Sequence, residues 1–149
     1  MGAEPDRRPD SGAAISGSER ELNFQTFELA HLGANISQHQ TGEQLTPDID
    51  LVVLADDVEL YVAGTHWVRS AAGRTGRIVR SMAWGPVSER RVKLASGLLV
   101  EYGFAPTSWA SVDPVDGGTA TVVSNGFRIL YDPDGMLDRL ATAVARLRA

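Results

Sequence analysis

Two aspartates introduce a stretch that is predicted to be a central strand. Asp48 and Asp50 lead into the aliphatic run from Leu51 to Leu54, which is typical of a strand buried on both faces. Alternate side chains of a strand point to the same face, so the two carboxylates share one edge of the sheet. At a spacing of roughly 6 Å and an effective dielectric constant of about 20, they repel each other by about 3 kcal/mol. The pair therefore indicates either a cation site or a solvated strand start, in which Asp48 supports the turn at Pro47.

A third carboxylate, Glu101, interrupts the apolar and aromatic stretch 98–104. Charged side chains are seldom buried without a partner. One interpretation pairs Glu101 with a base across a β-hairpin, namely Arg90, Arg91 or Lys93. The other interpretation brings Glu101 to the aspartate pair. Three carboxylates there could hold two magnesium ions, which prefer oxygen ligands and can clamp the attacking and leaving oxygens of a phosphoryl transfer.

Length and composition indicate one ordinary globular domain. The chain has 149 residues, 43% of them hydrophobic and 22% charged, and no apolar stretch approaches the length of a membrane span. The absence of cysteine excludes disulfides, thiolate metal sites and a cysteine nucleophile. The first ten residues lack the apolar core of a signal peptide, so we expect a cytoplasmic protein that does not bind membranes. A net charge of -5 argues against general nucleic-acid binding.

Short strands and helices are predicted to alternate along the chain. Residues 1–17 are rich in Pro, Gly, Asp, Arg and Ala and are predicted to form a disordered tail, followed by one domain over 18–149. A capping box at Ser18 predicts a helix that ends at Gly33, and the polar residues 34–46 predict a loop. Further helices are expected over 58–63, 66–71, 116–124 and 134–148, a short helix or loop over 105–113, and strands over 51–54, 77–84, 88–94, 98–104 and 127–131.

Residues 47–148 resemble the nucleotidyltransferases of the DNA polymerase beta superfamily, most of all its small stand-alone bacterial members. The resemblance is carried by PDIDLVVLADD at 47–57, WGP at 84–86, ERRV at 89–92, VEYGFAP at 100–106, DPVD at 113–116 and FRILYDP at 127–133. It implies an α+β fold with a nucleotidyltransferase-like mixed β-sheet on which helices pack. It also implies that Asp48, Asp50 and Glu101 hold two Mg²⁺ ions, and that Glu101 is the base for the attacking hydroxyl. The implied reaction transfers a nucleoside monophosphate, AMP from ATP or the equivalent from another nucleoside triphosphate, to a small molecule or a partner protein.

The phosphate-binding segment departs from the pattern of that family. The family carries a Gly-Ser motif about a dozen residues before its acidic pair, where a helix N-terminus grips the triphosphate. Here Gly33 is followed by Ala34, and Arg90 is a further candidate for contact with phosphate. Three alternatives remain: a degenerate phosphate loop at Gly33, an insertion after Gly17-Ser18, or a replaced N-terminal segment. The last alternative would make the protein an inactive binding module, either a pseudoenzyme or an antitoxin-like partner subunit.

Other polar and aromatic residues have structural explanations. His31, His39 and His66 lack the spacing of a metal site and are expected to be surface or packing residues. Trp67, Trp84 and Trp109 are expected in the core, and Trp84, beside Gly85-Pro86, is also a candidate pocket wall. Four aspartates lie in Pro- and Gly-rich turns that favour them for local hydrogen bonds, namely Asp113, Asp116, Asp132 and Asp134.

Overall fold

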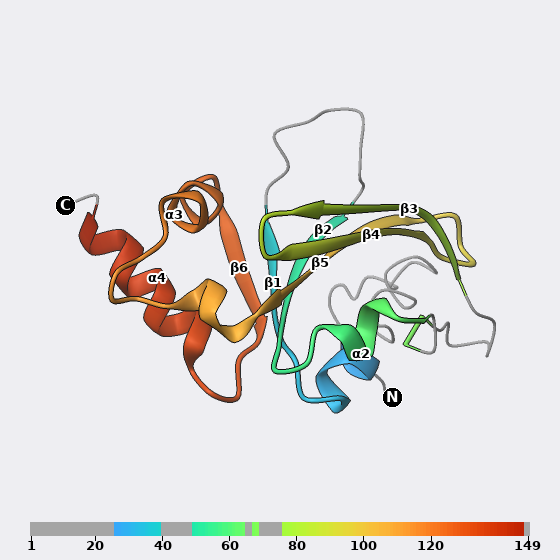
Figure 1. The fold of residues 1–149 in the computed structure, drawn as a ribbon, viewed down its shortest axis with the longest axis horizontal. Coiled ribbons are helices and arrows are strands. Elements are labelled where there is room, and N and C mark those ends of the chain that lie inside the picture. Colours follow the sequence, from blue (N-terminus) through green and yellow to red (C-terminus); the bar gives the residue numbers. More distant parts are fainter. Residues whose placement is uncertain (1–25, 40–48, 65–66, 69–75, 148–149) are drawn as a thin grey trace, which may run out of the picture.

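The protein has an α+β fold built on a six-stranded mixed sheet (Figure 1). The structure, a computed structural model, describes residues 26–39, 49–64, 67–68 and 76–147. The strand order is β3-β4-β5-β2-β1-β6, in which only β2 and β5 pair in parallel. The strands are β1 Asn35–His39, β2 Ile49–Ala55, β3 Arg77–Trp84, β4 Val87–Lys93, β5 Leu99–Pro106 and β6 Phe127–Tyr131.

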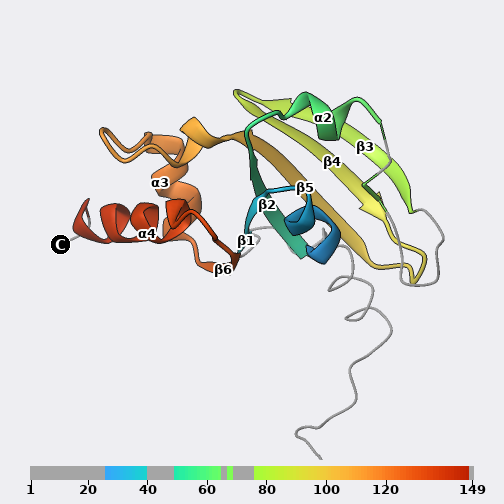
Figure 2. The ribbon, with the colours of Figure 1, turned by 90° about the horizontal axis from the view of Figure 1, so that it is seen from below.

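Helices cover both faces of the central strands. Residues 26–31 are helical, and the labelled helices are α2 Glu59–Val62, the 3-10 helix η2 Thr107–Ala110, α3 Gly117–Ser124 and α4 Met136–Leu147. Figure 2 shows α3 and α4 on one side of β1 and β2, with α2 and the helix at 26–31 on the other. In the described part of the chain, no helix has the length and apolar character needed to cross a membrane.

The aliphatic run of β2 explains this arrangement. Leu51 and Val53 contribute to a core beneath α2 that also contains Tyr61, Tyr102 and Phe104. The alternate residues of β2, including Leu54, contribute to a second core shared with η2, α3 and α4. Because successive side chains point to opposite faces, an apolar run without alternation is typical of a strand covered on both sides. The central strand predicted at 51–54 is therefore confirmed.

Most of the other predicted elements are confirmed in the described ranges. The β4–β5 hairpin forms, and its turn contains Gly97 at a φ of 95°, a conformation that favours glycine. Helices α3 and α4 lie within one or two residues of their predicted bounds, and the short helix expected in 105–113 is η2. Asp116 caps α3 by accepting a hydrogen bond from the Thr119 N–H at 3.0 Å. The predicted tail at 1–17 lies outside the described residues, as does most of the predicted helix 66–71.

The loop predicted over 34–46 is wrong for its first part, because Asn35–His39 forms β1 between β2 and β6. The polar side chains on one face of β1 are buried and find partners inside the fold. Ser37 Oγ hydrogen-bonds to His39 Nε2 at 2.9 Å, and Asn35 Nδ2 donates to Asp134 Oδ2 at 3.1 Å. A strand whose buried face is polar lacks the alternation of apolar and polar residues by which strands are predicted.

Candidate functional site

Asp50 and Glu101 lie side by side on the two parallel strands. They are register partners between β2 and β5. His39 on β1 pairs with Asp50, Arg91 on β4 pairs with Glu101, and Arg80 on β3 pairs with Arg91. Paired residues point to the same face of a sheet, so these five side chains form one line across five strands. We call this line, His39-Asp50-Glu101-Arg91-Arg80, the polar row.

Two arginines neutralise the acids at one end of the polar row. Arg91 Nη2 lies 3.1 Å from Glu101 Oε1, and Arg80 Nη2 lies 3.4 Å from Glu101 Oε2. Arg80 Nη2 also lies 3.0 Å from Oε1 of Glu89, which precedes Arg91 by two residues on the same face of β4. Glu101 and Glu89 are only 8% and 7% exposed. Buried carboxylates of this kind require such partners. The base that pairs with Glu101 across the hairpin is therefore Arg91, with Arg80 as a second partner.

Asp50 is the acid of the row that lacks this compensation. It forms no ion pair within the described ranges. The pKa of Asp50 is raised from 3.8 to about 6, mainly by burial and also by the negative charge of Glu89, whereas the positive charge of Arg91 acts in the opposite direction. The ionised Asp50 is thus unfavourable in the folded protein, and a proton or a metal cation would stabilise this position.

His39 ends the row as a buried, neutral side chain. Its ring lies 5.3 Å from the ring of Phe127 and makes an edge contact with Trp109 at 6.2 Å. Burial lowers the pKa of His39 to about 4, so the imidazole is uncharged at neutral pH. It serves as a packing residue, as expected, and it closes the side of the polar row beyond Asp50.

The structure does not bring Gly33 and Ala34 to the acids. Asn35 pairs with Leu54 at the far end of β2, whereas His39 pairs with Asp50. Four residues of strand separate the two ends, about 13 Å. Gly33 ends the helix at 26–31 with a φ of 98° and leads into β1, so this turn runs from helix to strand. The geometry of a phosphate loop requires the opposite order, from strand to helix.

Arg90 lies on the other face of the sheet from the polar row. Its register partner is Tyr102, which belongs to the core beneath α2. Arg90 Nη2 donates to the Val62 carbonyl at 3.4 Å, and Nη1 donates to the Glu89 carbonyl at 3.0 Å. Arg80 and Arg91 occupy the position beside the acids that the sequence led us to consider for Arg90. Asp48 lies outside the described residues.

Sequence reasoning missed Glu89 and the buried Ser37 of β1, and it did not place His39, expected as a surface or packing residue, beside Asp50. A signal for Glu89 was present, because alternation along β4 places it on the face of Arg91 and hence of Glu101. The residues of β1 gave no comparable signal, since that strand itself was not predicted.

The carboxylate oxygens of the polar row are the type of ligand that magnesium prefers. Among the described residues, no group of three His, Cys, Asp or Glu side chains is arranged to hold a metal ion. Magnesium, however, is usually bound through one or two carboxylates together with substrate phosphates and water. Asp50 and Glu101 supply two carboxylates, and the raised pKa of Asp50 marks a place where positive charge is favourable. These residues fit a magnesium ion that arrives with a phosphate ligand.

The chain matches no protein-family model and no curated protein sequence. The side chains of the polar row are therefore the basis for a functional proposal.

Proposed function

We propose that this protein is a magnesium-dependent nucleotidyltransferase that transfers a nucleoside monophosphate, AMP in the case of ATP, to a hydroxyl of a small molecule or protein. The observation that carries the proposal is the direct pairing of Asp50 with Glu101 on two parallel strands. A carboxylate whose pKa is raised by burial and by a second acid, beside arginines, is typical of sites that bind a cation and phosphate.

In this mechanism, Asp50 and Glu101 would hold magnesium, which when bound would neutralise phosphate charge and polarise the bond that breaks. The acceptor oxygen forms a bond to the α-phosphorus as the bond to pyrophosphate breaks, and the hydroxyl proton passes to Glu101. Arg80 is the arginine best able to leave Glu101 for a phosphate oxygen. Its side chain is 39% exposed, against 17% for Arg91, and its Nη2 is already shared between two acids.

A second function is favoured by the ion pairs themselves. Both carboxylate oxygens of Glu101 have an arginine partner, and Gly33 lies at the far end of β2 from Asp50. An inactive nucleotidyltransferase-like module that binds a partner protein would keep such a neutralised site. This alternative predicts that Asp50 and Glu101 can be changed without loss of nucleotide binding, because there is none to lose.

Calorimetric titration of ATP, with and without magnesium, tests the proposal. The variants are Asp50→Asn and Glu101→Gln, with Asp56→Asn as a matched control, because Asp56 follows β2 at its opposite end and is exposed. We expect micromolar binding that requires magnesium and is lost in the first two variants only. Absence of binding at millimolar ATP, or equal binding by all four proteins, would refute the proposed enzymatic function. If magnesium-dependent binding is found, the complex would be screened for pyrophosphate release with hydroxyl acceptors.

A further inference from the structure

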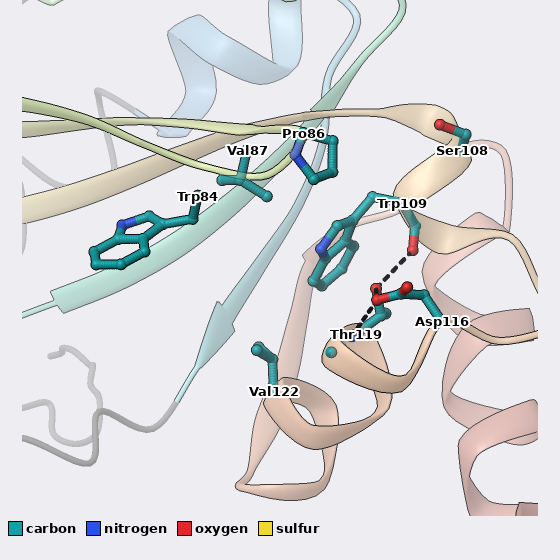
Figure 3. Close-up of a pocket in the computed structure, with 9 residues that line it drawn as sticks. Trp84, Pro86, Val87, Ser108, Trp109, Asp116, Thr119 and Val122 are labelled. Carbon is teal, nitrogen blue, oxygen red and sulfur yellow. Dashed lines mark hydrogen bonds between the residues drawn. The ribbon is translucent and has the colours of Figure 1, made fainter.

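A cavity of about 340 Å³ lies between the tip of the β3–β4 hairpin and α3 (Figure 3). Trp84 and Val87 of the hairpin form one side, and Trp109 of η2 and Val122 of α3 form the other. We call this cavity the tryptophan pocket. Its volume is at the lower end of the range for small-molecule sites, which suits a single ring system.

The walls of the tryptophan pocket favour a flat aromatic ligand. Trp84 is 57% exposed, so much of its indole surface is accessible to a ligand. Trp84 and the largely buried Trp109 both line the cavity, and stacking on aromatic side chains is the common means of holding nucleic-acid bases.

Polar groups at the start of α3 complete the lining of the pocket. Asp116 and Thr119 both line it, and the Thr119 hydroxyl lies 3.2 Å from the Trp109 carbonyl oxygen and 3.4 Å from Asp116 Oδ2, either of which can accept its proton (Figure 3). The Asp116 carboxylate can accept hydrogen bonds only, so it would select a ring that bears an amino group.

The pocket and the polar row share one face of the sheet and are joined by direct contacts. Trp84 Nε1 donates to Glu89 Oε1 at 3.1 Å, the same oxygen that accepts from Arg80. Val87 and Arg91 point to the same side of β4, four residues apart, or about 13 Å. On the other side, Trp109 contacts His39, the register partner of Asp50. An extended nucleoside triphosphate can span this separation.

From these contacts we infer that the tryptophan pocket binds the base of the nucleotide, a heteroaromatic ring with an amino group, while the phosphates lie at the polar row. The identity of the ring as part of a nucleotide rests on the proposed function. The stacking site itself rests on Trp84, Trp109 and Asp116.

The test uses adenosine, which carries the ring without phosphate, and the ¹⁵N-labelled full chain. The three indole N–H signals are followed by NMR and assigned through Trp→Phe variants. Adenosine should shift the signals of Trp84 and Trp109 and leave that of Trp67 unchanged. Trp67 belongs to the core on the opposite face of the sheet and donates to the Tyr61 carbonyl, so it is an internal control. Magnesium tripolyphosphate has no ring, so it should leave the signals of Trp67 and Trp109 unchanged. Any shift it causes should be confined to the Trp84 signal, because the Trp84 N–H donates to Glu89.

A pocket-filling variant gives the second measurement. Val122→Phe should weaken adenosine and MgATP binding at least tenfold, because the new ring occupies the cavity. Ser124→Phe places the same ring at an exposed position of α3 outside the pocket lining and should change neither affinity.

The outcomes separate this inference from the proposed function. If MgATP binds through Asp50 and adenosine moves no indole signal, the base site is overturned and the nucleotidyltransferase stands. If adenosine moves Trp84 and Trp109 but MgATP binding ignores Asp50→Asn, the stacking site stands and the proposed function falls. If Val122→Phe weakens adenosine but not MgATP, the pocket receives the ring of an acceptor, and the assignment to the donor base is overturned.

Discussion

Replacing Asp50 with asparagine should stabilise the folded protein at neutral pH in the absence of magnesium. The pKa of Asp50 rises from 3.8 to about 6 on folding, which corresponds to an unfavourable free energy of about 3 kcal/mol for the charged form. The side chain retains partial contact with water, so screening reduces the expected gain to about 1–2 kcal/mol.

The sign of the pH dependence follows from the direction of the shift. The folded state binds the Asp50 proton more tightly than the unfolded state, so ionisation of Asp50 lowers stability as pH rises from about 4 to above 6. Asp50→Asn removes this loss. The variant and the wild type should therefore differ little near pH 4, and the variant should be more stable at pH 7.5.

Urea unfolding followed by tryptophan fluorescence at pH 4.5 and pH 7.5 measures this difference. Asp56→Asn is the control, because it removes an equal charge from an exposed position just after the same strand. When the free energies of unfolding of the variant and the wild type are compared at the same pH, the contributions of all other titrating groups cancel. If Asp50→Asn destabilises the protein at pH 7.5, or if its effect is the same at both pH values, Asp50 is not an unfavourable carboxylate and the reasoning fails. Added magnesium and ATP should stabilise the wild type and Asp56→Asn by mass action, and should not stabilise Asp50→Asn.

Three further predictions concern stability, and urea unfolding tests each of them. Gly76→Ala should cost about 1–3 kcal/mol, because its methyl group would lie 2.9 Å from a side-chain carbon and 3.0 Å from a carbonyl oxygen; Gly117→Ala, with nothing within 4 Å, should be neutral or stabilising by up to about 1 kcal/mol. Asp116→Ala should cost about 1 kcal/mol through loss of the helix cap, and Asp116→Asn should not. Arg91→Met should cost about 2–3 kcal/mol, because Glu101 keeps only one arginine; a double variant Arg91→Met/Glu101→Gln that recovers nothing would contradict this account.

The elements that sequence could predict are those whose stability is mainly local or apolar. The run 51–54, the β4–β5 hairpin and α4 carry their own signals, namely uninterrupted aliphatic residues, a glycine turn and apolar residues at helical spacing. In contrast, β1 is stable because distant residues pair with its polar side chains. The hydrogen-bond partner of Asn35 is Asp134, on the connection to α4, and no residue near Asn35 in the sequence indicates this contact.

The acidic residues of the candidate site could be predicted from the sequence more readily than the arginines that pair with them. One interpretation of Glu101 brought it to the aspartate pair and the other gave it a base across the hairpin, and the structure shows Glu101 beside both Asp50 and Arg91. The choice between Arg90 and Arg91 depended on the register of the hairpin, because a shift of one residue reverses the face. Metal binding and nucleotide transfer stay predictions, since they depend on ligands beyond the fold itself.

The parallel pairing of β2 with β5 also has a consequence for folding. Contacts between β3, β4 and β5 are made through short hairpin turns, whereas β2 meets β5 only after the intervening chain has closed a long loop. Non-local contacts of this kind form slowly and late. We therefore expect the two acids to meet after the β3–β4 and β4–β5 hairpins have formed. A ligand held by both strands should slow unfolding far more than it speeds folding, because the transition state has not yet built the site.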